Sequence, residues 1–282
     1  MKNKFLITAP ELKALIIAEN PVIIDTREGA VYGKGHIPGA VNIHHIFTYL
    51  ATDKNGGLQK LAETFIEDFS DAGISETDSV VIYEDTLSNG FGQSGRGYFL
   101  LKYLGHRDVL VLDGGFAAWE REGFEISTTV TVKPETTYHA TIDNSIIATR
   151  EQILASLDDE NIVLLDCRDR DEWIGESSSP YGKDFSPRKG RIPGAVWMEW
   201  YELFDRTSGI PLFKTDEQAL ELCKSVGITK ESDVIIYCFK GSRASTTLIA
   251  FKKAGITKVR NYFASWNEWA EDPSLPIDAG VI

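Results

Sequence analysis

The strongest constraint on this chain is an internal repeat, because a chain that repeats its own sequence folds into repeated structural units. The segment "FLITAPELKALIIAENPVIIDTR" (5–27) aligns without gaps on "IIATREQILASLDDENIVLLDCR" (146–168). Identical residues recur in register, among them the pairs Thr8/Thr149, Asn20/Asn161, Asp25/Asp166 and Arg27/Arg168. Further matches follow in the same order: "GHIPGAV" with "GRIPGAV", "DSVVIYE" with "SDVIIYC", and "GFAAW" with "YFASW". The chain is therefore a duplication of one unit.

The length and the apolar pattern of each copy predict the fold class. The 282 residues suit two ordinary domains. We predict an N-terminal domain over 1–124, a threonine-rich linker over 125–145 and a C-terminal domain over 146–282. Short β-branched segments such as Val80–Tyr83 and Val234–Tyr237 alternate with helical patterns that end at glycine. Such a pattern predicts an α/β fold in each domain, with a mostly parallel central sheet and helices on both faces.

Charge and cysteine content narrow the class of function. The formal net charge is −13, from 29 basic and 42 acidic side chains, which argues against a nucleic-acid partner. No stretch approaches the roughly 20 apolar residues of a membrane span, so we expect no membrane partner and a cytoplasmic location. The three cysteines form no CxxC pair, and the five histidines complete no zinc pattern. We therefore expect no metal and no organic cofactor.

The candidate chemistry lies in "VIIYCFKGSRAS" (234–245), where a cysteine follows an apolar strand and precedes a helix. The residues of this loop are Cys238, Phe239, Lys240, Gly241, Ser242 and Arg243. A short turn into a helix aims successive N–H groups into one concavity, and the helix N-terminus adds positive charge. With Lys240 and Arg243 nearby, we expect a lowered pKa at Cys238, which would make it a nucleophile. The alternative is a buried, inert thiol.

The first copy differs at this loop. After Tyr83 it carries "EDTLSNGFGQSGR" (84–96), with Glu84 at the position that Cys238 occupies in the second copy. This longer loop is acidic, rich in glycine and free of cysteine. The contrast predicts a non-catalytic first domain and a catalytic second domain, with Cys238 as the reactive group.

These features make the chain similar to the tandem-domain rhodanese family of sulfurtransferases over nearly its whole length. The motifs that carry the resemblance are the paired "DTR" and "DCR" segments, the paired "IPGA" turns, "DGGFAAW" and "CFKGSRA". The resemblance implies two rhodanese-like domains of which only the C-terminal one is catalytic. It also implies that Cys238 takes a sulfane sulfur from a donor, becomes a persulfide and passes the sulfur to a nucleophilic acceptor. Residues 239–243 would form the active-site loop.

The resemblance leaves more than one sulfur donor open. Lys240 is similar to the lysine of thiosulfate sulfurtransferases, so we predict a small anionic donor, thiosulfate, with cyanide, a small thiol or a thioredoxin-like protein as acceptor. Enzymes of the 3-mercaptopyruvate type hold a carboxylate with two arginines; Glu172 stands at one such position and Arg188 near the other. We include Arg188 among the predicted substrate-binding residues. A 3-mercaptopyruvate sulfurtransferase and a persulfide carrier for a protein acceptor remain alternatives.

A cysteine-dependent phosphatase is a further alternative of a different reaction class. Phosphatases of this type carry C-x5-R, whereas four residues separate Cys238 from Arg243. The smaller loop suits a sulfur atom better than a phosphoryl group.

Three further features bear on the architecture or on the site. The Asp25–Arg27 and Asp166–Arg168 pairs occur in both copies, so we expect them to fix the architecture. Cys167 is either a packing residue or a resolving thiol. The second copy also has an insertion over residues 169–189, which is either a substrate contact beside the site or a solvated surface loop.

Overall fold

The computed structural model describes residues 4–87 and 89–279 and divides the chain into two compact units. Unit 1 is made of the described parts of Met1–Tyr49, Gln59–Asp143 and Phe204–Phe213. Unit 2 is made of the described parts of Leu50–Leu58, Asn144–Leu203 and Lys214–Ile282. Each unit therefore takes a short segment from the half of the sequence that mainly forms the other unit.

Specific hydrogen bonds account for the two exchanged segments. In residues 50–58, the Asp53 N–H donates to the Glu268 carboxylate at 2.9 Å, so this segment is part of unit 2. In residues 204–213, the Phe213 N–H donates to the Asp113 carboxylate at 3.0 Å, so this segment is part of unit 1. The predicted contiguous domains 1–124 and 146–282 do not include these exchanges, because sequence proximity does not reveal such long-range bonds.

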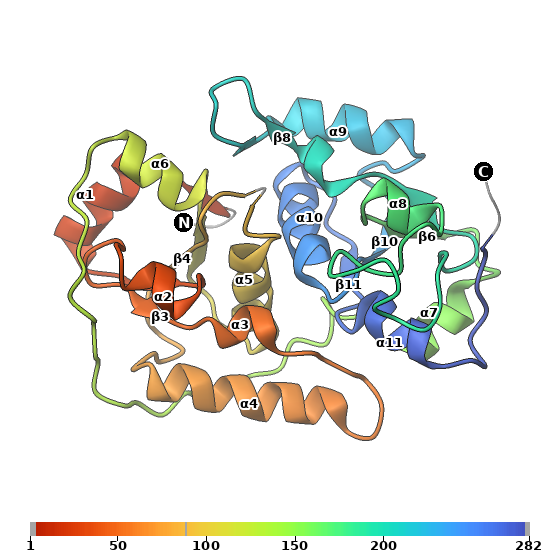
Figure 1. Ribbon diagram of the computed structural model, residues 1–282, viewed down its shortest axis with the longest axis horizontal. Coiled ribbons are helices and arrows are strands. Elements are labelled where there is room, and N and C mark those ends of the chain that lie inside the picture. The colour runs from red at the N-terminus through yellow and green to blue at the C-terminus, as the bar shows by residue number, and fades with distance from the viewer. Residues whose placement is uncertain (1–3, 88, 280–282) are drawn as a thin grey trace. The chain divides into compact units, whose positions relative to one another are not determined.

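Both units contain a parallel sheet (Figure 1), and the four-strand order of unit 2 repeats the order of the last four strands of the unit 1 sheet. The order in unit 1 is β1-β5-β4-β2-β3, and every pairing is parallel. Its strands are β1 (Leu6–Ile7), β2 (Val22–Asp25), β3 (Val41–Asn42), β4 (Val80–Tyr83) and β5 (Val109–Leu112). All residues of β2, β4 and β5 are buried, as expected for strands covered on both faces.

The sheet of unit 2 has the order β11-β10-β6-β7, also with every pairing parallel. Its strands are β6 (Ile162–Asp166), β7 (Val196–Trp197), β10 (Asp233–Tyr237) and β11 (Val259–Asn261). A parallel bridge between Ile147 and Asn261 adds the equivalent of β1 at the edge beside β11. Strands β8 (Phe204–Asp205) and β9 (Leu212–Phe213) form a separate antiparallel hairpin.

Helices cover both faces of each sheet, as the sequence predicted. In the first half they are α1 (Ala9–Glu19), α2 (Gly29–Tyr32), α3 (His45–Thr48), α4 (Gly57–Asp71), α5 (Gln93–Tyr103) and α6 (Gly115–Arg121). In the second half they are α7 (Arg150–Ser156), α8 (Arg170–Trp173), the 3-10 helix η1 (Trp200–Leu203), α9 (Asp216–Ser225), α10 (Ser242–Lys253) and α11 (Ser265–Glu271). In unit 1, Val81 shares a core cluster with Leu12 of α1 and Trp119 of α6. On the opposite face, Ile82 approaches Gly97 of α5. The predicted α/β class is confirmed.

The residues that recur in the repeat make equivalent contacts in both halves. Asp25 and Arg27 form a buried ion pair, and the Arg27 guanidinium also donates to the Gly35 carbonyl at 2.8 Å. Asp166 and Arg168 repeat this arrangement, and Arg168 donates to the Gly190 carbonyl at 2.7 Å. The ion pairs therefore tie the end of β2 or β6 to the following "IPGA" turn. Their predicted architectural role is confirmed.

Residues 125–143 belong to unit 1 and form no helix, and residues 144 and 145 already belong to unit 2. Ser127 pairs with His36 in an isolated antiparallel bridge, and the Thr136 N–H donates to the Ser70 carbonyl at 3.0 Å. Backbone bonds of this kind hold an extended segment in place although it belongs to no sheet.

Among the residues that the structure describes, no helix is long and apolar enough to cross a membrane.

Candidate active site

Cys238 lies directly beyond a central strand of unit 2. Strand β10 ends at Tyr237 and helix α10 begins at Ser242, so a very short turn joins them (Figure 1). Strand β10 lies between β6 and β11 in the sheet. The carboxyl edge of a parallel sheet is where open α/β folds place their ligands. The turn therefore brings Cys238 to the N-terminal end of α10 at this edge.

The turn depends on Gly241. Its φ of 86° is left-handed, and a Cβ at this position would lie 2.6 Å from the Phe263 carbonyl oxygen, so another residue would strain the loop. The Gly241 N–H donates to Cys238 Sγ at 3.1 Å. The Gly241 carbonyl in turn accepts from Ser245 Oγ at 2.6 Å and from Asn261 Nδ2 at 3.2 Å. The glycine is thus held so that its N–H faces the sulfur.

The surroundings of Cys238 favour its thiolate form. Burial alone would raise its pKa, since the side chain is only 1% exposed. A hydrogen bond from the Cys167 thiol and the positive charge of Arg243 oppose this effect. Hydrogen bonds from the N–H groups of Ala244 and Lys240 lower the pKa further. Together these groups hold the pKa of Cys238 well below its usual range. A thiolate is the reactive form of cysteine.

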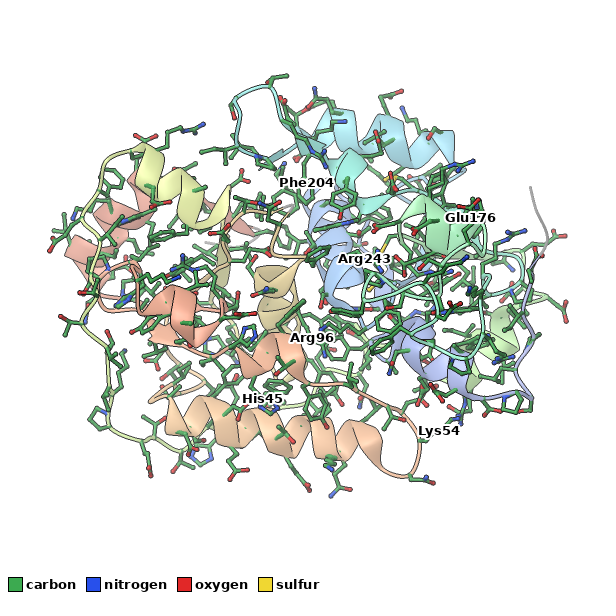
Figure 2. All side chains as sticks on the ribbon, viewed as in Figure 1. His45, Lys54, Arg96, Glu176, Phe204 and Arg243 are labelled. Carbon is green, nitrogen blue, oxygen red and sulfur yellow. The ribbon has the colours of Figure 1, made fainter. Side chains whose placement is uncertain are left out.

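Arg243 is held beside the cysteine by a buried carboxylate. It lies in the first turn of α10 (Figure 2), and its two terminal nitrogens donate to the two Glu172 oxygens at 2.6 and 3.0 Å. It also donates to Asp169 at 2.9 Å. Both Arg243 and Glu172 are almost fully buried. Such a bidentate pair fixes the guanidinium plane, so the position of the cation beside Cys238 is set by α8 as well as by α10.

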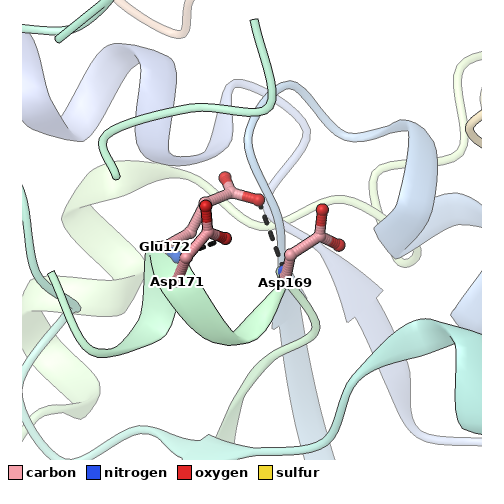
Figure 3. Close-up of side chains that lie close together, drawn as sticks. All are labelled: Asp169, Asp171 and Glu172. Atoms are coloured by element: carbon pink, nitrogen blue, oxygen red, sulfur yellow. Dashed lines mark hydrogen bonds between the residues drawn. The ribbon is translucent and has the colours of Figure 1, made fainter. Parts of the chain in front are cut away.

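Three acidic side chains gather at the start of α8, namely Asp169, Asp171 and Glu172 (Figure 3). The carboxylates of Asp169 and Glu172 accept from Arg243. The Asp171 carboxylate accepts from the Glu172 N–H at 2.9 Å. The contacts of the group are therefore those of a helix cap and of an ion pair with Arg243.

The insertion over residues 169–189 packs on the loop through aromatic side chains. Phe239 is buried, and its ring lies 5.5 Å from that of Tyr181 and 5.8 Å from that of Phe185, measured between centroids. The Lys240 ammonium lies 4.9 Å from the centre of the Tyr181 ring. Tyr181 and Phe185 are 48% and 56% exposed. The insertion thus supplies an aromatic rim beside the loop rather than a free surface segment.

Comparison with known proteins decides the family. A family model for the rhodanese-like domain matches residues 8–122 and again 149–272. This chain belongs to the rhodanese family. A protein from Mycolicibacterium smegmatis is 31% identical to it over 287 residues, which cover 99% of each chain. A thiosulfate sulfurtransferase from Azotobacter vinelandii is 28% identical over 97% of this chain and 96% of its own length.

Solved structures agree on the fold. A structure of EanB in complex with hercynine superposes with a TM-score of 0.85 at 24% sequence identity, covering 98% of this chain and 69% of the EanB chain. At this identity the likeness concerns the fold. The family match and the relatives make this chain a rhodanese-type sulfurtransferase with the predicted fold of two rhodanese-like domains.

Ser242 offers this rhodanese an unused polar group at the site. Its side chain is 3% exposed, and its hydroxyl oxygen has no hydrogen-bond partner among the described residues. A buried hydroxyl without a partner is costly unless something else binds it. Because Ser242 is the first residue of α10, the hydroxyl is available to an anion at the helix N-terminus.

Arg188 does not serve the predicted purpose. Its guanidinium donates to backbone carbonyls at the end of α11 and just beyond it, namely those of Trp269, Ala270, Asp272 and Leu275. A helix C-terminus presents unsatisfied carbonyls, and an arginine satisfies them well. We therefore replace the predicted substrate contact at Arg188 with a capping role, which uses all three guanidinium nitrogens.

The structure brings the other predicted site residues together in one turn, from Cys238 to Arg243. It adds three contacts that the sequence did not specify: Glu172 pairs with Arg243, Tyr181 lies beside Lys240, and Cys167, for which the sequence left a packing or a resolving role open, lies beside Cys238. One signal was available for Glu172, because an acidic residue stands where an arginine was expected. The other two depend on how the insertion and the sheet fold.

Proposed function

We propose that this rhodanese-family sulfurtransferase uses thiosulfate as the donor and Cys238 as the sulfur-carrying nucleophile. The observation that carries the proposal is the environment of Cys238: a sulfur that accepts the Gly241 N–H, lies beside Arg243 and has a pKa well below the usual range. Cys238 Sγ attacks the outer sulfur of thiosulfate, the sulfur–sulfur bond of the donor breaks, and sulfite leaves with the electron pair. The product is a persulfide on Cys238.

The second step of the proposed reaction returns the enzyme to its starting form. A thiophilic acceptor attacks the outer sulfur of the persulfide, and the Cys238 thiolate leaves. Cyanide would become thiocyanate, and a thiol or a thioredoxin-like protein would become a persulfide. The same N–H groups that stabilise the thiolate in the free enzyme stabilise it as the leaving group.

Two further groups suit a dianionic donor. Lys240 supplies a cation two residues after Cys238 in the loop, and Ser242 supplies the unpartnered hydroxyl for an oxygen of the sulfonate. The name of the Azotobacter vinelandii relative supports thiosulfate as well. The alternative donor, 3-mercaptopyruvate, is less well served, because Arg188 caps α11 and Glu172 pairs with Arg243.

We further propose that the first half is non-catalytic and that residues 146–282 carry the reaction. Glu84 stands where the second half has Cys238, and it has no equivalent chemistry with a sulfane sulfur. The three cysteines are free thiols, a state that a reducing compartment such as the cytoplasm would preserve.

The proposal is tested by the leaving group of each donor. Thiosulfate should release one equivalent of sulfite from the wild-type protein in the absence of acceptor, and thiocyanate should form when cyanide is added. 3-Mercaptopyruvate should release pyruvate much more slowly. Cys238→Ser should release neither product, whereas Cys223→Ser, which changes a buried thiol on α9, serves as the matched control. Sulfite release by Cys238→Ser, or none by the wild type, would refute the proposal.

A further inference from the structure

The two cysteines nearest the site occupy matching positions on neighbouring strands. Strands β6 and β10 pair in parallel, and the last pair in register is Asp166 with Tyr237. Cys167 directly follows strand β6, and Cys238 directly follows strand β10. The Cys167 N–H still donates to the Tyr237 carbonyl at 3.1 Å. Neighbouring strands lie about 4.8 Å apart. This separation falls within the range that a disulfide spans between Cα atoms.

The side chains of this pair share one buried environment. Cys167 and Cys238 are 0% and 1% exposed, and the single proton of the Cys167 thiol has two acceptors within reach, the Tyr237 carbonyl at 3.2 Å and Cys238 Sγ. Burial, the hydrogen bond to Cys238 and the charge of Cys238 raise the pKa of Cys167 well above its usual range. In the reduced enzyme, Cys167 is thus the thiol that holds a proton and Cys238 the thiolate that attacks a donor.

The equivalent pair in the first half shows that the fold does not require a thiol here. Thr26 occupies the position of Cys167, and its hydroxyl donates to the Tyr83 carbonyl at 3.0 Å. This is the same bond that Cys167 makes to Tyr237. A hydroxyl therefore suffices for the local structure, and the sulfur at 167 adds chemistry only in the half that also carries Cys238.

We propose that Cys167 is a resolving thiol that displaces sulfide from the Cys238 persulfide and forms a disulfide with Cys238. Cys167 transfers its proton to the outer sulfur of the persulfide anion, and the Cys167 sulfur attacks Cys238 Sγ. The bond between Cys238 Sγ and the outer sulfur breaks, and the outer sulfur leaves with the electron pair as hydrosulfide. The two cysteine sulfurs are oxidised by two electrons in total, and the sulfane sulfur is reduced by two.

The same step defines the class of acceptor. Once Cys238 carries the outer sulfur, the inner sulfur is neutral, so the charge that had raised the pKa of Cys167 is removed. The resulting disulfide must be reduced before another turnover, and a dithiol does this by exchange, becoming a disulfide itself. This inference rests on the proposed function, because it needs the persulfide on Cys238. It makes a dithiol the natural electron source and sulfide the product.

The test uses the full chain with thiosulfate and no acceptor. The wild type should release sulfite and then an equal amount of sulfide, and its intact mass should fall by two hydrogens. Cys167→Ser should release sulfite but no sulfide, and should keep the mass of one added sulfur. Cys223→Ser should behave as the wild type. Peptide mapping should find a bond between the peptides that contain Cys167 and Cys238.

The outcomes separate this inference from the proposed function. If the wild type releases sulfite but keeps the added sulfur and yields no sulfide, the resolving role is wrong while the persulfide mechanism stands. If the wild type releases no sulfite at all, both fail. Cys167→Thr, the residue that the first half uses, provides a second variant should Cys167→Ser fold poorly; sulfide release by either folded variant at the wild-type level would also exclude the role.

Discussion

The two halves of the chain place different groups in equivalent positions at the start of a helix. In unit 2, Cys238 Sγ accepts the Gly241 N–H in the short turn before α10. In unit 1, the Glu84 carboxylate accepts the Gln93 N–H at 3.0 Å and the Ser94 hydroxyl at 2.6 Å at the start of α5. One helix N-terminus thus lies at a cysteine whose pKa is held well below its usual range, and the other is filled by a side chain of its own loop.

The difference shows how two copies of one fold can keep the same structure while their equivalent loops hold different groups. Glu84 is fully buried, and Gly90 makes room for it, because a Cβ at Gly90 would lie 1.9 Å from the carboxylate. The longer first loop therefore wraps around the carboxylate. The arginines that match in the two loops diverge as well (Figure 2): Arg96 donates to the Tyr49 carbonyl, whereas Arg243 pairs with Glu172. Only the second arrangement leaves a cation beside a sulfur.

The largest effect on sulfur transfer should come from replacing Cys238, and replacing Glu84 at the equivalent position of the first half serves as the comparison. Cys238→Ser should reduce sulfur transfer from thiosulfate to cyanide to the background rate, because a serine cannot carry a sulfane sulfur. Glu84→Gln should leave the rate at the wild-type level. The rate of thiocyanate formation measures the activity of both variants. A strong loss of activity in Glu84→Gln would show that the first half takes part in the reaction.

Removing the cation should affect both stability and reactivity. Arg243→Gln leaves Glu172 buried without its partner, which should lower the free energy of unfolding by about 3–5 kcal/mol. The double variant with Glu172→Gln should recover part of this loss, as denaturant unfolding would show. The pKa of Cys238 should also rise, so the rate of sulfite release would need a higher pH to reach its plateau.

Arg96→Gln is the matched control for this change in the first half. It removes a buried arginine from the equivalent loop, so it should also lower the free energy of unfolding. The pH dependence of sulfite release, however, should be the same as in the wild type. A shift in Arg96→Gln equal to that in Arg243→Gln would contradict the local electrostatic role of Arg243.

The buried carboxylate of the first half should make stability depend on pH. Burial raises the pKa of Glu84 to about 8, despite the hydrogen bonds it accepts. Because the folded pKa exceeds the unfolded one, the protonated carboxyl stabilises the fold fully below the unfolded pKa, and this stability is lost as pH rises through about 8. Glu84→Gln should therefore gain about 2–3 kcal/mol over the wild type between about pH 6 and 9. Equal slopes of unfolding free energy against pH in both proteins would contradict this.

The smallest effect should come from Lys240. Lys240→Ala should lower kcat/KM for thiosulfate about tenfold, which corresponds to about 1.4 kcal/mol, since one cation near the dianion is lost. Lys240→Arg should retain most of the activity, and Lys224→Ala on the exposed side of α9 should retain all of it. An unchanged kcat/KM in Lys240→Ala would mean that the ammonium contacts the Tyr181 ring and does not bind the donor.

Much of the fold could be predicted because its signals are local or repeated. The Asp–Arg pairs of the DxR segments form between residues two positions apart, and the "IPGA" turns are local as well. The loop from Cys238 to Arg243 was predictable for the same reason. Arg188 was misread because its partners lie more than eighty residues away at the end of α11, and nothing near it in the sequence indicates them.

By itself the sequence determined the duplication, the α/β class and the loop that holds Cys238, because periodicity and short-range turn chemistry encode these directly. Only the tertiary structure decided which residues contact Cys238 and Arg243. The pairing of β6 with β10 places Cys167 beside Cys238, and the fold of the insertion places Glu172 against Arg243. Such contacts arise from strand register and from long-range packing, which no local pattern specifies.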